Sequence, residues 1–328
     1  MKFIFALCLV FNVAQASPSI NGIALGLYYK GDVDTSRYDE MIDEIADTGA
    51  THISLITLWS MRDIRASTIV PHPLETPSDA LLTRVIKHAK TRGLKVMLFP
   101  ILWIETRGDG EWRGKLAPKD PSAWWASYEA FIIHFARLAQ KADADIFSIG
   151  SELSSMEQFQ GRWTDIAKAV RRVYSGQLIY SANWDHYEDV QFWHAVDLVG
   201  LTGYYRLTES MNPSIADLVQ AWRPIKKSLR SWSKGLNKTF LFTEVGYPSL
   251  DGAAHSPWDY TTGKKLDLEE QRICYEAFRL TWQNEKRLQG VFFWNWWGPK
   301  DGRNHWYTPR GKPALGEIQK WMKASGRK

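Results

Sequence analysis

The sequence has little cysteine and no long hydrophobic run. Only two of its 328 residues are cysteines, and Cys8 lies within an apolar N-terminal stretch that is too short to span a bilayer. We interpret residues 1–16 as a signal peptide with cleavage after Ala16, and we therefore expect an exported (periplasmic or secreted) protein without a membrane span. The mature chain, residues 17–328, then keeps only Cys274 and can form no internal disulfide.

Three further features are lacking. Lysine and arginine are scattered and the formal net charge is only +5, so no basic stripe marks a nucleic-acid partner. The eight histidines are also scattered, and the first predicted strand has no His-x-His pair, which disfavours a metal-dependent barrel hydrolase. Residues 26–30 do not form a glycine-rich phosphate turn, which disfavours an open doubly wound sheet. We expect no metal and no organic cofactor.

What the sequence does contain is a regular alternation of two patterns. Short β-branched or aromatic runs, typical of buried strands, occur at residues 20–28, 52–58, 95–102, 146–149, 177–181, 198–201, 239–243 and 290–294. Amphipathic stretches predict helices at residues 36–48, 78–92, 124–141, 163–174, 188–195, 215–229, 269–286 and 314–323. This order predicts an α/β fold with one catalytic domain, a single (β/α)8 TIM barrel.

Helix-end signals support these boundaries. Gly49, Gly93 and Gly176 each follow a predicted helix and precede a predicted strand, which is typical of a left-handed helix stop. Asp120 followed by Pro121 predicts a helix N-terminus with proline at the first helical position.

Two segments that follow predicted strands are unusually long, at residues 103–121 and 246–266. Loops longer than about 12–15 residues are usually functional or disordered. Both segments carry aromatic residues, and both follow the carboxyl ends of strands, where barrels build their active sites. We expect these two loops to shape a binding site.

Two glutamates are the strongest functional signal. Glu152 and Glu244 each come at the end of a short apolar run that is typical of a strand. A carboxylate at the tip of a buried strand costs desolvation free energy, and two such groups on different strands are what hydrolysis of a glycosidic bond requires. Taken singly, each has a structural alternative: Glu152 as a helix N-terminal carboxylate and Glu244 as a salt-bridged loop residue.

The 17 tryptophans form the second signal. A flat aromatic ring packs well against the C–H face of a sugar, although packing of the barrel mouth is an equally open explanation. The tryptophans beyond predicted strand ends, which we take as substrate-binding candidates, are Trp59, Trp103, Trp184, Trp294, Trp296 and Trp297.

Four polar candidates lie beside them. Arg62 follows the second strand and could bind a charged sugar substituent or a carboxylate, but a surface ion pair with the next residue fits as well. Asn183 follows the fifth strand and is a candidate for a sugar hydroxyl. Tyr204, with Tyr205 as the second choice, follows the sixth strand and could donate a hydrogen bond that keeps Glu244 ionised.

The motifs around these residues resemble glycoside hydrolase family 113. The most specific are Phe-Ser-Ile-Gly-Ser-Glu-Leu at residues 147–153 and Phe-Thr-Glu-Val-Gly-Tyr at residues 242–247. The resemblance continues through nearly the whole mature chain, at residues 112–116, 124–128, 180–184, 203–205 and 293–296.

The resemblance implies a retaining (β/α)8 glycosidase that acts by double displacement, most often on β-1,4-mannan. It implies that Glu152 is the general acid/base and that Glu244 is the nucleophile, with carboxyl groups about 5–5.5 Å apart. Glu152 must then hold a proton while Glu244 is ionised. One position departs from the wider clan, in which an asparagine that grips the sugar 2-hydroxyl usually precedes the acid/base. Here that residue is Ser151, and Asn183 is a candidate replacement.

Two alternatives stay open beside a mannan hydrolase. The same carboxylates could cleave another β-linked glycan, such as peptidoglycan or a β-glucan. A barrel that binds glycans without catalysis would keep the aromatic cleft, but the presence of both glutamates disfavours it. In every case the expected partner is a polysaccharide or an oligosaccharide.

Overall fold

The computed structural model describes residues 19–27, 36–261 and 265–325. The predicted signal peptide, residues 1–16, and the end of the first predicted strand, residue 28, lie outside the described residues. Within the described ranges, no helix combines the length and the apolar character that crossing a membrane would require.

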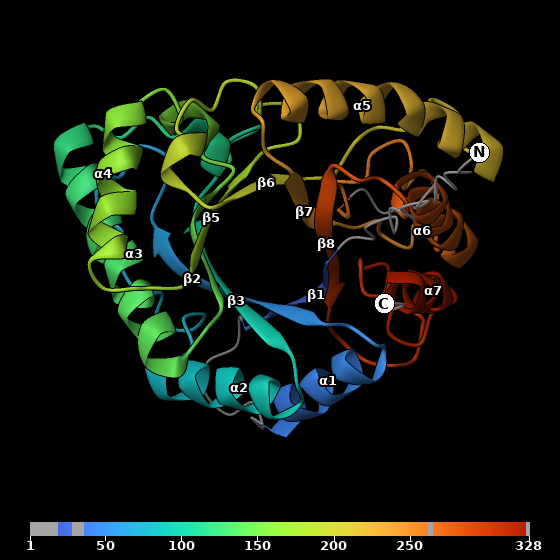
Figure 1. The fold of residues 1–328 in the computed structure, drawn as a ribbon, viewed down its shortest axis with the longest axis horizontal. Helices are drawn as coiled ribbons and strands as arrows, with labels where there is room; N and C mark the ends of the chain where they lie inside the picture. Colours follow the sequence, from blue (N-terminus) through green and yellow to red (C-terminus); the bar gives the residue numbers. More distant parts are fainter. Residues whose placement is uncertain (1–18, 28–35, 262–264, 326–328) are drawn as a thin grey trace, which may run out of the picture.

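Eight parallel strands form a closed barrel in which each strand pairs with the next in sequence and the last pairs with the first (Figure 1). The strands are β1 (Ile20–Gly26), β2 (His52–Met61), β3 (Lys95–Ile104), β4 (Ile146–Ser151), β5 (Gln177–Ala182), β6 (Leu198–Thr202), β7 (Phe240–Val245) and β8 (Leu288–Trp296). The predicted (β/α)8 fold is confirmed, and all eight strands lie where the apolar runs placed them.

Helices surround the barrel (Figure 1). They are α1 (Ser36–Asp47), α2 (Asp79–Thr91), α3 (Pro121–Ala142), α4 (Gln160–Arg171), α5 (Ile215–Gly235), α6 (Leu268–Trp282) and α7 (Ala314–Ser325), with the 3-10 turns η1 (Arg113–Lys115), η2 (Ser154–Met156) and η3 (Trp193–Ala195). The helix predicted at residues 188–195 is wrong, because the connection from β5 to β6 holds only η3. The backbone hydrogen bonds in that segment span three residues, from the Asp189 N–H to His186 O and from the Ala195 N–H to Phe192 O, as in turns rather than in an α-helix.

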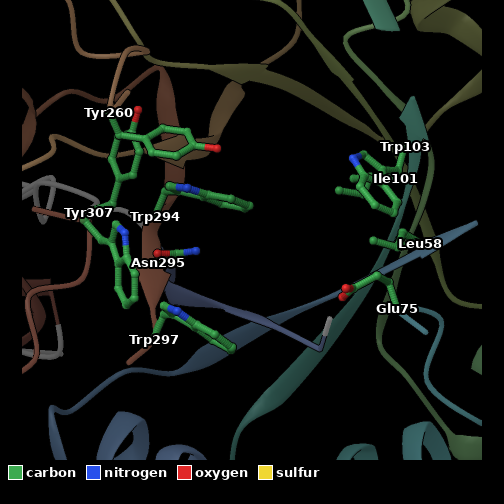
Figure 2. A pocket seen from close by; sticks show the side chains of 10 residues that line it. Leu58, Glu75, Ile101, Trp103, Tyr260, Trp294, Asn295, Trp297 and Tyr307 are labelled. Carbon is green, nitrogen blue, oxygen red and sulfur yellow. The ribbon is translucent and has the colours of Figure 1, made fainter. Parts of the chain in front are cut away.

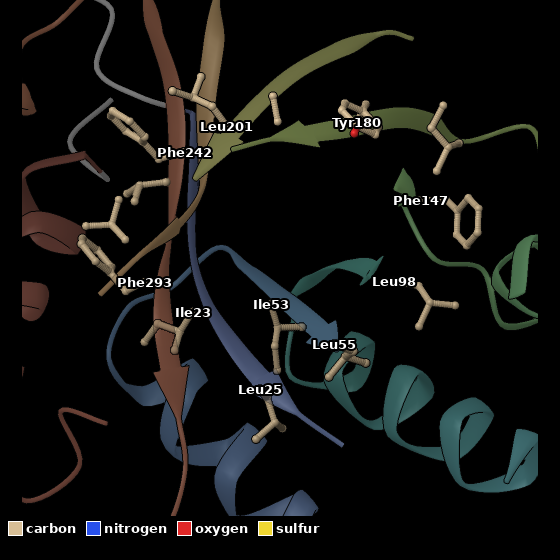
Figure 3. Close-up of a cluster of buried hydrophobic side chains, with 14 of the residues drawn as sticks. Ile23, Leu25, Ile53, Leu55, Leu98, Phe147, Tyr180, Leu201, Phe242 and Phe293 are labelled. Atoms are coloured by element: carbon tan, nitrogen blue, oxygen red, sulfur yellow. The ribbon is translucent and has the colours of Figure 1, made fainter. Parts of the chain in front are cut away.

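The barrel has two separate hydrophobic layers. One layer fills the barrel interior with side chains from the strands, among them Ile56, Phe99 and Phe292. The other lies between the strands and the helices, and Figure 3 shows Leu55 and Leu98 as part of this outer layer. Strands buried on both faces explain why the sequence shows continuous apolar runs rather than alternation.

Glycine is required where β8 closes the barrel against β1. Ile20 pairs with Gly290 in register, and a Cβ at position 290 would lie 2.2 Å from the Ile20 carbonyl oxygen. No side chain fits at that distance, so the close approach of the two strands depends on glycine.

Most of the predicted helix-end signals are present. Gly49 and Gly93 have φ values of 88° and 78°, as a left-handed helix stop requires. The Asp120 side chain accepts a hydrogen bond from the Ala123 N–H at 3.0 Å and caps α3. The prediction for Gly176 is wrong: its φ is not positive, and the space that a Cβ would need is filled by the ring of Tyr174.

Candidate active site

Glu152 directly follows β4 at the mouth of the barrel. Its φ of 55° is unusual for a residue other than glycine, and its backbone N–H donates to the Ser181 carbonyl of β5 at 2.8 Å. The side chain is buried. Because all strands are parallel, the end of β4 and the end of β7 open at the same rim.

Glu244 lies near the carboxyl end of β7, opposite Thr202 of β6, and is also buried. The Tyr204 hydroxyl donates to Glu244 Oε2 at 2.8 Å. This is the contact that the sequence predicted for Tyr204. Within the described residues Glu244 forms no ion pair, so the salt-bridged alternative does not apply.

Arg113 is the ionic partner of Glu152. It begins η1 in the long loop between β3 and α3, and its Nη2 donates to Glu152 Oε2 at 2.5 Å. The Ser155 hydroxyl donates to the Leu116 carbonyl at 2.9 Å and ties this loop to η2. The loop after β3 therefore reaches the catalytic rim, as its length predicted.

The electrostatic environment of the two carboxyls differs from the expectation. Burial, and then the negative charge of Glu152, raise the pKa of Glu244, while the Arg113 charge and the Tyr204 hydrogen bond oppose the rise. Burial of Glu244 therefore favours its neutral form, whereas the predicted role as nucleophile needs it ionised. The contact between Arg113 and Glu152, which no local pattern revealed, brings a positive charge that acts in the opposite direction and lowers the pKa of Glu244.

A cavity of about 430 Å³ opens beside this pair. Figure 2 shows two facing walls, one aromatic wall from β8 and the loops near it and one wall from β2, β3 and the loop after β2. Glu75 lies on the second wall with its carboxylate directed into the gap. The residues that line the cavity are Leu58, Glu75, Ile101, Trp103, Tyr260, Trp294, Asn295, Trp297, Trp306 and Tyr307.

The cavity adjoins Glu244 through two aromatic residues. A Cβ at Gly246, two residues after Glu244, would lie 3.0 Å from both Trp294 Cβ and Tyr307 Cδ1. The Tyr307 ring packs edge-on against Tyr204, with 6.1 Å between the centroids. A sugar ring in the cavity would therefore lie next to the buried carboxyl pair.

A comparison with protein families identifies the family to which this chain belongs. The profile of Glycoside Hydrolase Family 113 matches residues 27–307, which is most of the chain. The chain belongs to glycoside hydrolase family 113. This family 113 protein is therefore a glycoside hydrolase, and the resemblance found in the sequence is confirmed. No curated protein matches the chain.

Solved structures of the same family are similar over nearly their whole length. The family 113 β-mannanase AaManA from Alicyclobacillus acidocaldarius, in complex with ManMIm, is 26% identical, with a TM-score of 0.84 and coverage of 94% of this chain and 98% of the other. Two structures of GH113 β-1,4-mannanase, one of them a complex, are 23% and 24% identical, each with a TM-score of 0.83 and coverage of 93% and 98%. Because these two structures are less than 25% identical to this chain, their similarity shows the shared fold alone.

Three of the predicted tryptophans of this family 113 hydrolase line the cavity: Trp103 on one wall and Trp294 and Trp297 on the other. Trp184 and Tyr205 lie elsewhere. They border a separate hollow of about 410 Å³ beside the start of the β5–β6 connection and α5.

Two predicted tryptophans do not face the cavity. Trp59 packs against Phe131 and Phe135 of α3, and the Trp296 indole donates to Glu44 of α1 at 2.8 Å. Both therefore lie in the layer between barrel and helices, and the structure does not support them as substrate-binding residues. Both residues lie at strand ends, as predicted, but their side chains point toward the surrounding helices and not into the cavity.

The remaining polar candidates have protein partners. Arg62 is 75% exposed in its side chain and pairs with Asp63 at 3.0 Å, the surface alternative that the sequence left open. Asn183 donates to Asp185 Oδ1 at 2.6 Å and accepts from the Thr202 hydroxyl at 3.3 Å, so both ends of its amide are engaged at the rim.

Sequence reasoning missed several residues of the site. Arg113 and Tyr260 lie in the two long loops that were predicted to be functional, so their length was the available signal. Glu75, Trp306 and Tyr307 lie in other connections, where the sequence carried no comparable signal.

One group of acidic residues could hold a metal ion by geometry. Ligand atoms of Asp251, Asp267 and Glu270 lie within 4.8 Å of one another. Glu270 accepts hydrogen bonds from the N–H groups of Gly252 and Ala254 at 2.7 and 2.9 Å, and Asp267 caps α6. Glu270 and Asp267 therefore accept hydrogen bonds from backbone donors, and Glu270 anchors the loop after β7.

Proposed function

We propose that this glycoside hydrolase cleaves β-1,4-linked mannan with retention of configuration, with Glu244 as nucleophile and Glu152 as general acid/base. One observation carries the proposal: two buried carboxyls from different strand ends influence each other's charge beside an aromatic cavity. A retaining glycosidase needs such a pair at short range.

The reaction follows from the two positions. A sugar in the cavity presents its anomeric carbon to Glu244, whose carboxylate attacks and forms a glycosyl ester. Glu152 gives its proton to the leaving oxygen in the same step. Glu152 then takes a proton from water, and the resulting hydroxide equivalent cleaves the ester and releases Glu244.

The neighbours of the pair adjust its charge. Only the form with the proton on Glu152 and with Glu244 ionised can react. The Tyr204 hydrogen bond and the Arg113 charge both favour ionised Glu244. Because like charges at short range disfavour double ionisation, the negative charge of Glu152 raises the pKa of Glu244 and so opposes them.

The substrate proposal rests on the relatives and on the cavity. The similar family structures are named as β-mannanases or β-1,4-mannanases. The facing walls that carry Trp103, Trp294 and Trp297 offer flat apolar surfaces, while Glu75 and Asn295 offer polar groups for hydroxyls. This combination suits a neutral sugar chain.

The decisive experiment is Glu244→Gln. The amide keeps the shape but cannot attack, so kcat on β-1,4-mannan should fall by about 10⁴-fold. Glu209→Gln, which changes an exposed carboxylate, serves as the matched control and should keep full activity. Proton NMR of the first product from the wild-type enzyme should show the β-anomer.

Other outcomes would contradict the proposal. Full activity of Glu244→Gln would remove the nucleophile assignment, and an α-anomer as first product would exclude retention. Turnover of β-glucan, xylan, chitosan or peptidoglycan with none of β-mannan would replace the proposed substrate but leave the two glutamates in their roles.

A further inference from the structure

A buried carboxyl lies just beyond Glu152 and takes no part in the reaction proposed above. Glu157 follows η2 and is only 1% exposed. Its Oε1 accepts a hydrogen bond from the Tyr180 hydroxyl at 2.7 Å, and its Oε2 has no hydrogen-bond partner among the described residues. Burial of a half-satisfied carboxyl is costly, so a compensating role is expected.

Tyr180 connects this carboxyl to the backbone at Glu152. The Tyr180 hydroxyl also accepts a hydrogen bond from the N–H of Leu153, the residue after Glu152, at 3.3 Å. Its ring lies against β4 so closely that a Cβ at Gly150 would be 2.8 Å from Tyr180 Cε2. Tyr180 of β5 therefore supports the chain on both sides of Glu152.

That support acts on a strained residue. The left-handed φ of 55° at Glu152 is unfavourable for a residue with a side chain, and such a conformation persists only where the surroundings hold it. Hydrogen bonds to β5 hold both peptide groups: the Glu152 N–H donates to Ser181 O and the Leu153 N–H donates to Tyr180. Without them the carboxyl would leave the rim.

The surroundings of Glu157 are acidic. Burial raises its pKa to about 7 against the Tyr180 hydrogen bond, and the negative charges of Asp189, Glu152 and Asp185 add to the rise. A neutral Glu157 can still accept from Tyr180 through its carbonyl oxygen, and it adds no second negative charge next to Glu152.

We propose that Glu157 is a positioning residue for Glu152, which it holds at the catalytic rim through the hydroxyl of Tyr180. The inference rests on the proposed acid/base role of Glu152. The buried hydrogen bonds that link Glu157, Tyr180 and Leu153 fix the orientation of the Glu152 side chain through the backbone, without contacting the Glu152 carboxyl.

The experiment uses leaving groups that differ in their need for an acid. Two aryl glycosides are built on the sugar that the wild-type enzyme is shown to cleave, one releasing 2,4-dinitrophenolate and one releasing phenolate. Dinitrophenolate leaves without protonation, whereas phenolate needs Glu152. Glu157→Ala should lower kcat/KM for the phenyl glycoside by about 10²-fold and change the dinitrophenyl glycoside much less. Tyr180→Phe, which keeps the ring, should act in the same direction.

Two further variants make the result specific. Glu157→Gln keeps an oxygen that accepts from Tyr180 and should restore most of the phenyl glycoside activity. Glu285→Gln changes another buried carboxyl, which is paired with Lys226 and Arg230, and should leave the ratio of the two substrates unchanged. If Glu157→Ala fails to fold, Tyr180→Phe carries the test.

The outcomes separate this inference from the proposed function. Equal losses on both substrates in Glu157→Ala and Tyr180→Phe, or no loss, would overturn the positioning role. The same measurement on Glu152→Gln tests the acid/base itself: if that variant shows no dependence on the leaving group, the role of Glu152 is wrong. A leaving-group effect in Glu152→Gln without one in the other two would overturn the positioning inference alone.

Discussion

At the scale of single residues, Glu152 and Glu244 differ in what surrounds them. Glu152 pairs with Arg113, while Glu244 is buried and receives one hydrogen bond from Tyr204. The negative charge of Glu152 raises the pKa of Glu244 and the positive charge of Arg113 lowers it. The charge state of Glu244, the proposed nucleophile, therefore depends on its burial and on groups from other strands and loops.

This balance predicts opposite pH shifts in two variants. The acidic limb of kcat/KM on a dinitrophenyl glycoside reports ionisation of Glu244, because this leaving group needs no acid. Glu152→Gln removes a negative charge, which lowers the pKa of Glu244, so the limb should move to lower pH by about one unit. Arg113→Gln removes a positive charge and should move it to higher pH. Shifts of the same sign in both variants would refute the electrostatic account.

At the scale of elements, α1 is tied to the end of β8 and to the segment that leads into α7. Glu44 of α1 accepts hydrogen bonds from Trp296 Nε1 at 2.8 Å and from Arg310 Nε and Nη2 at 2.6 and 2.9 Å, and it also pairs with Lys300. Arg310 is almost fully buried. This cluster joins the first helix to the last strand, next to the seam where the barrel closes.

The cluster predicts a pH-dependent loss of stability. Glu44→Gln removes the carboxylate that binds the buried Arg310 at 2.6 and 2.9 Å, leaves only the more distant Glu40 at 3.7 Å, and should lower the free energy of unfolding by about 3 kcal/mol at pH 7. Burial alone would raise the pKa of Glu44, but hydrogen bonds from Arg310, Lys300 and Trp296 outweigh it and lower the pKa from 4.5 to about 2. The folded value lies below the unfolded one, so this stabilisation is present above pH 4.5 and is lost as the pH falls towards 2.

Denaturant titrations at pH 7 and pH 3 would measure this effect, and the difference between wild type and variant should shrink at pH 3. Glu40→Gln is the control, since Glu40 also pairs with Lys300 at 3.0 Å and with Arg310 at 3.7 Å but is 57% exposed in its side chain, and its replacement should have little effect. A constant difference at both pH values would contradict the linkage.

At the scale of the whole molecule, no disulfide holds the described chain together. Cys274 is a free, fully buried cysteine on α6, and burial raises the pKa of its thiol well above the usual value. The barrel is held instead by its two hydrophobic layers. Burial of this kind is common for a free cysteine that packs as a small apolar side chain.

This architecture predicts that reductant has no effect on the thermal midpoint of the chain from residue 17 onward, in which Cys274 is the one cysteine, because no internal disulfide is available to break. Cys274 should react with a thiol reagent only when the barrel unfolds, so labelling should follow the denaturant transition. Rapid labelling of the native protein would contradict this, and a fully unfolded sample provides the control for reagent activity.

The sequence by itself determined the barrel and the placement of both glutamates. Eight apolar runs separated by helical patterns allow few other topologies, and parallel strands bring their carboxyl ends to one rim. The positions of Glu152 and Glu244 at that rim therefore followed from chain order alone. The length of two loops also indicated that the segments holding Arg113 and Tyr260 were functional, but it did not indicate which residues these two side chains contact.

Only the tertiary structure decided which way the strand-end tryptophans face. Strands that are buried on both sides carry apolar residues on both faces, so their sequence shows no alternation. The sequence therefore could not distinguish Trp59, which faces α3, from Trp103, which faces the cavity. In β8 the register with β1 shifts between Phe293 and Trp296, and such an irregularity changes which later side chains face outward. Trp294 and Trp296 therefore face opposite sides although they are two residues apart.

The pairing of Arg113 with Glu152 and the link from Glu157 through Tyr180 to Leu153 were likewise decided by folding. Arg113 is 39 residues from Glu152 in sequence, and Tyr180 is 23 residues from Glu157. Local periodicity reports the face and the type of an element, because it arises from neighbouring residues. Local periodicity carries no information about which side chains from separate elements contact one another. The electrostatics of the site depend on those contacts.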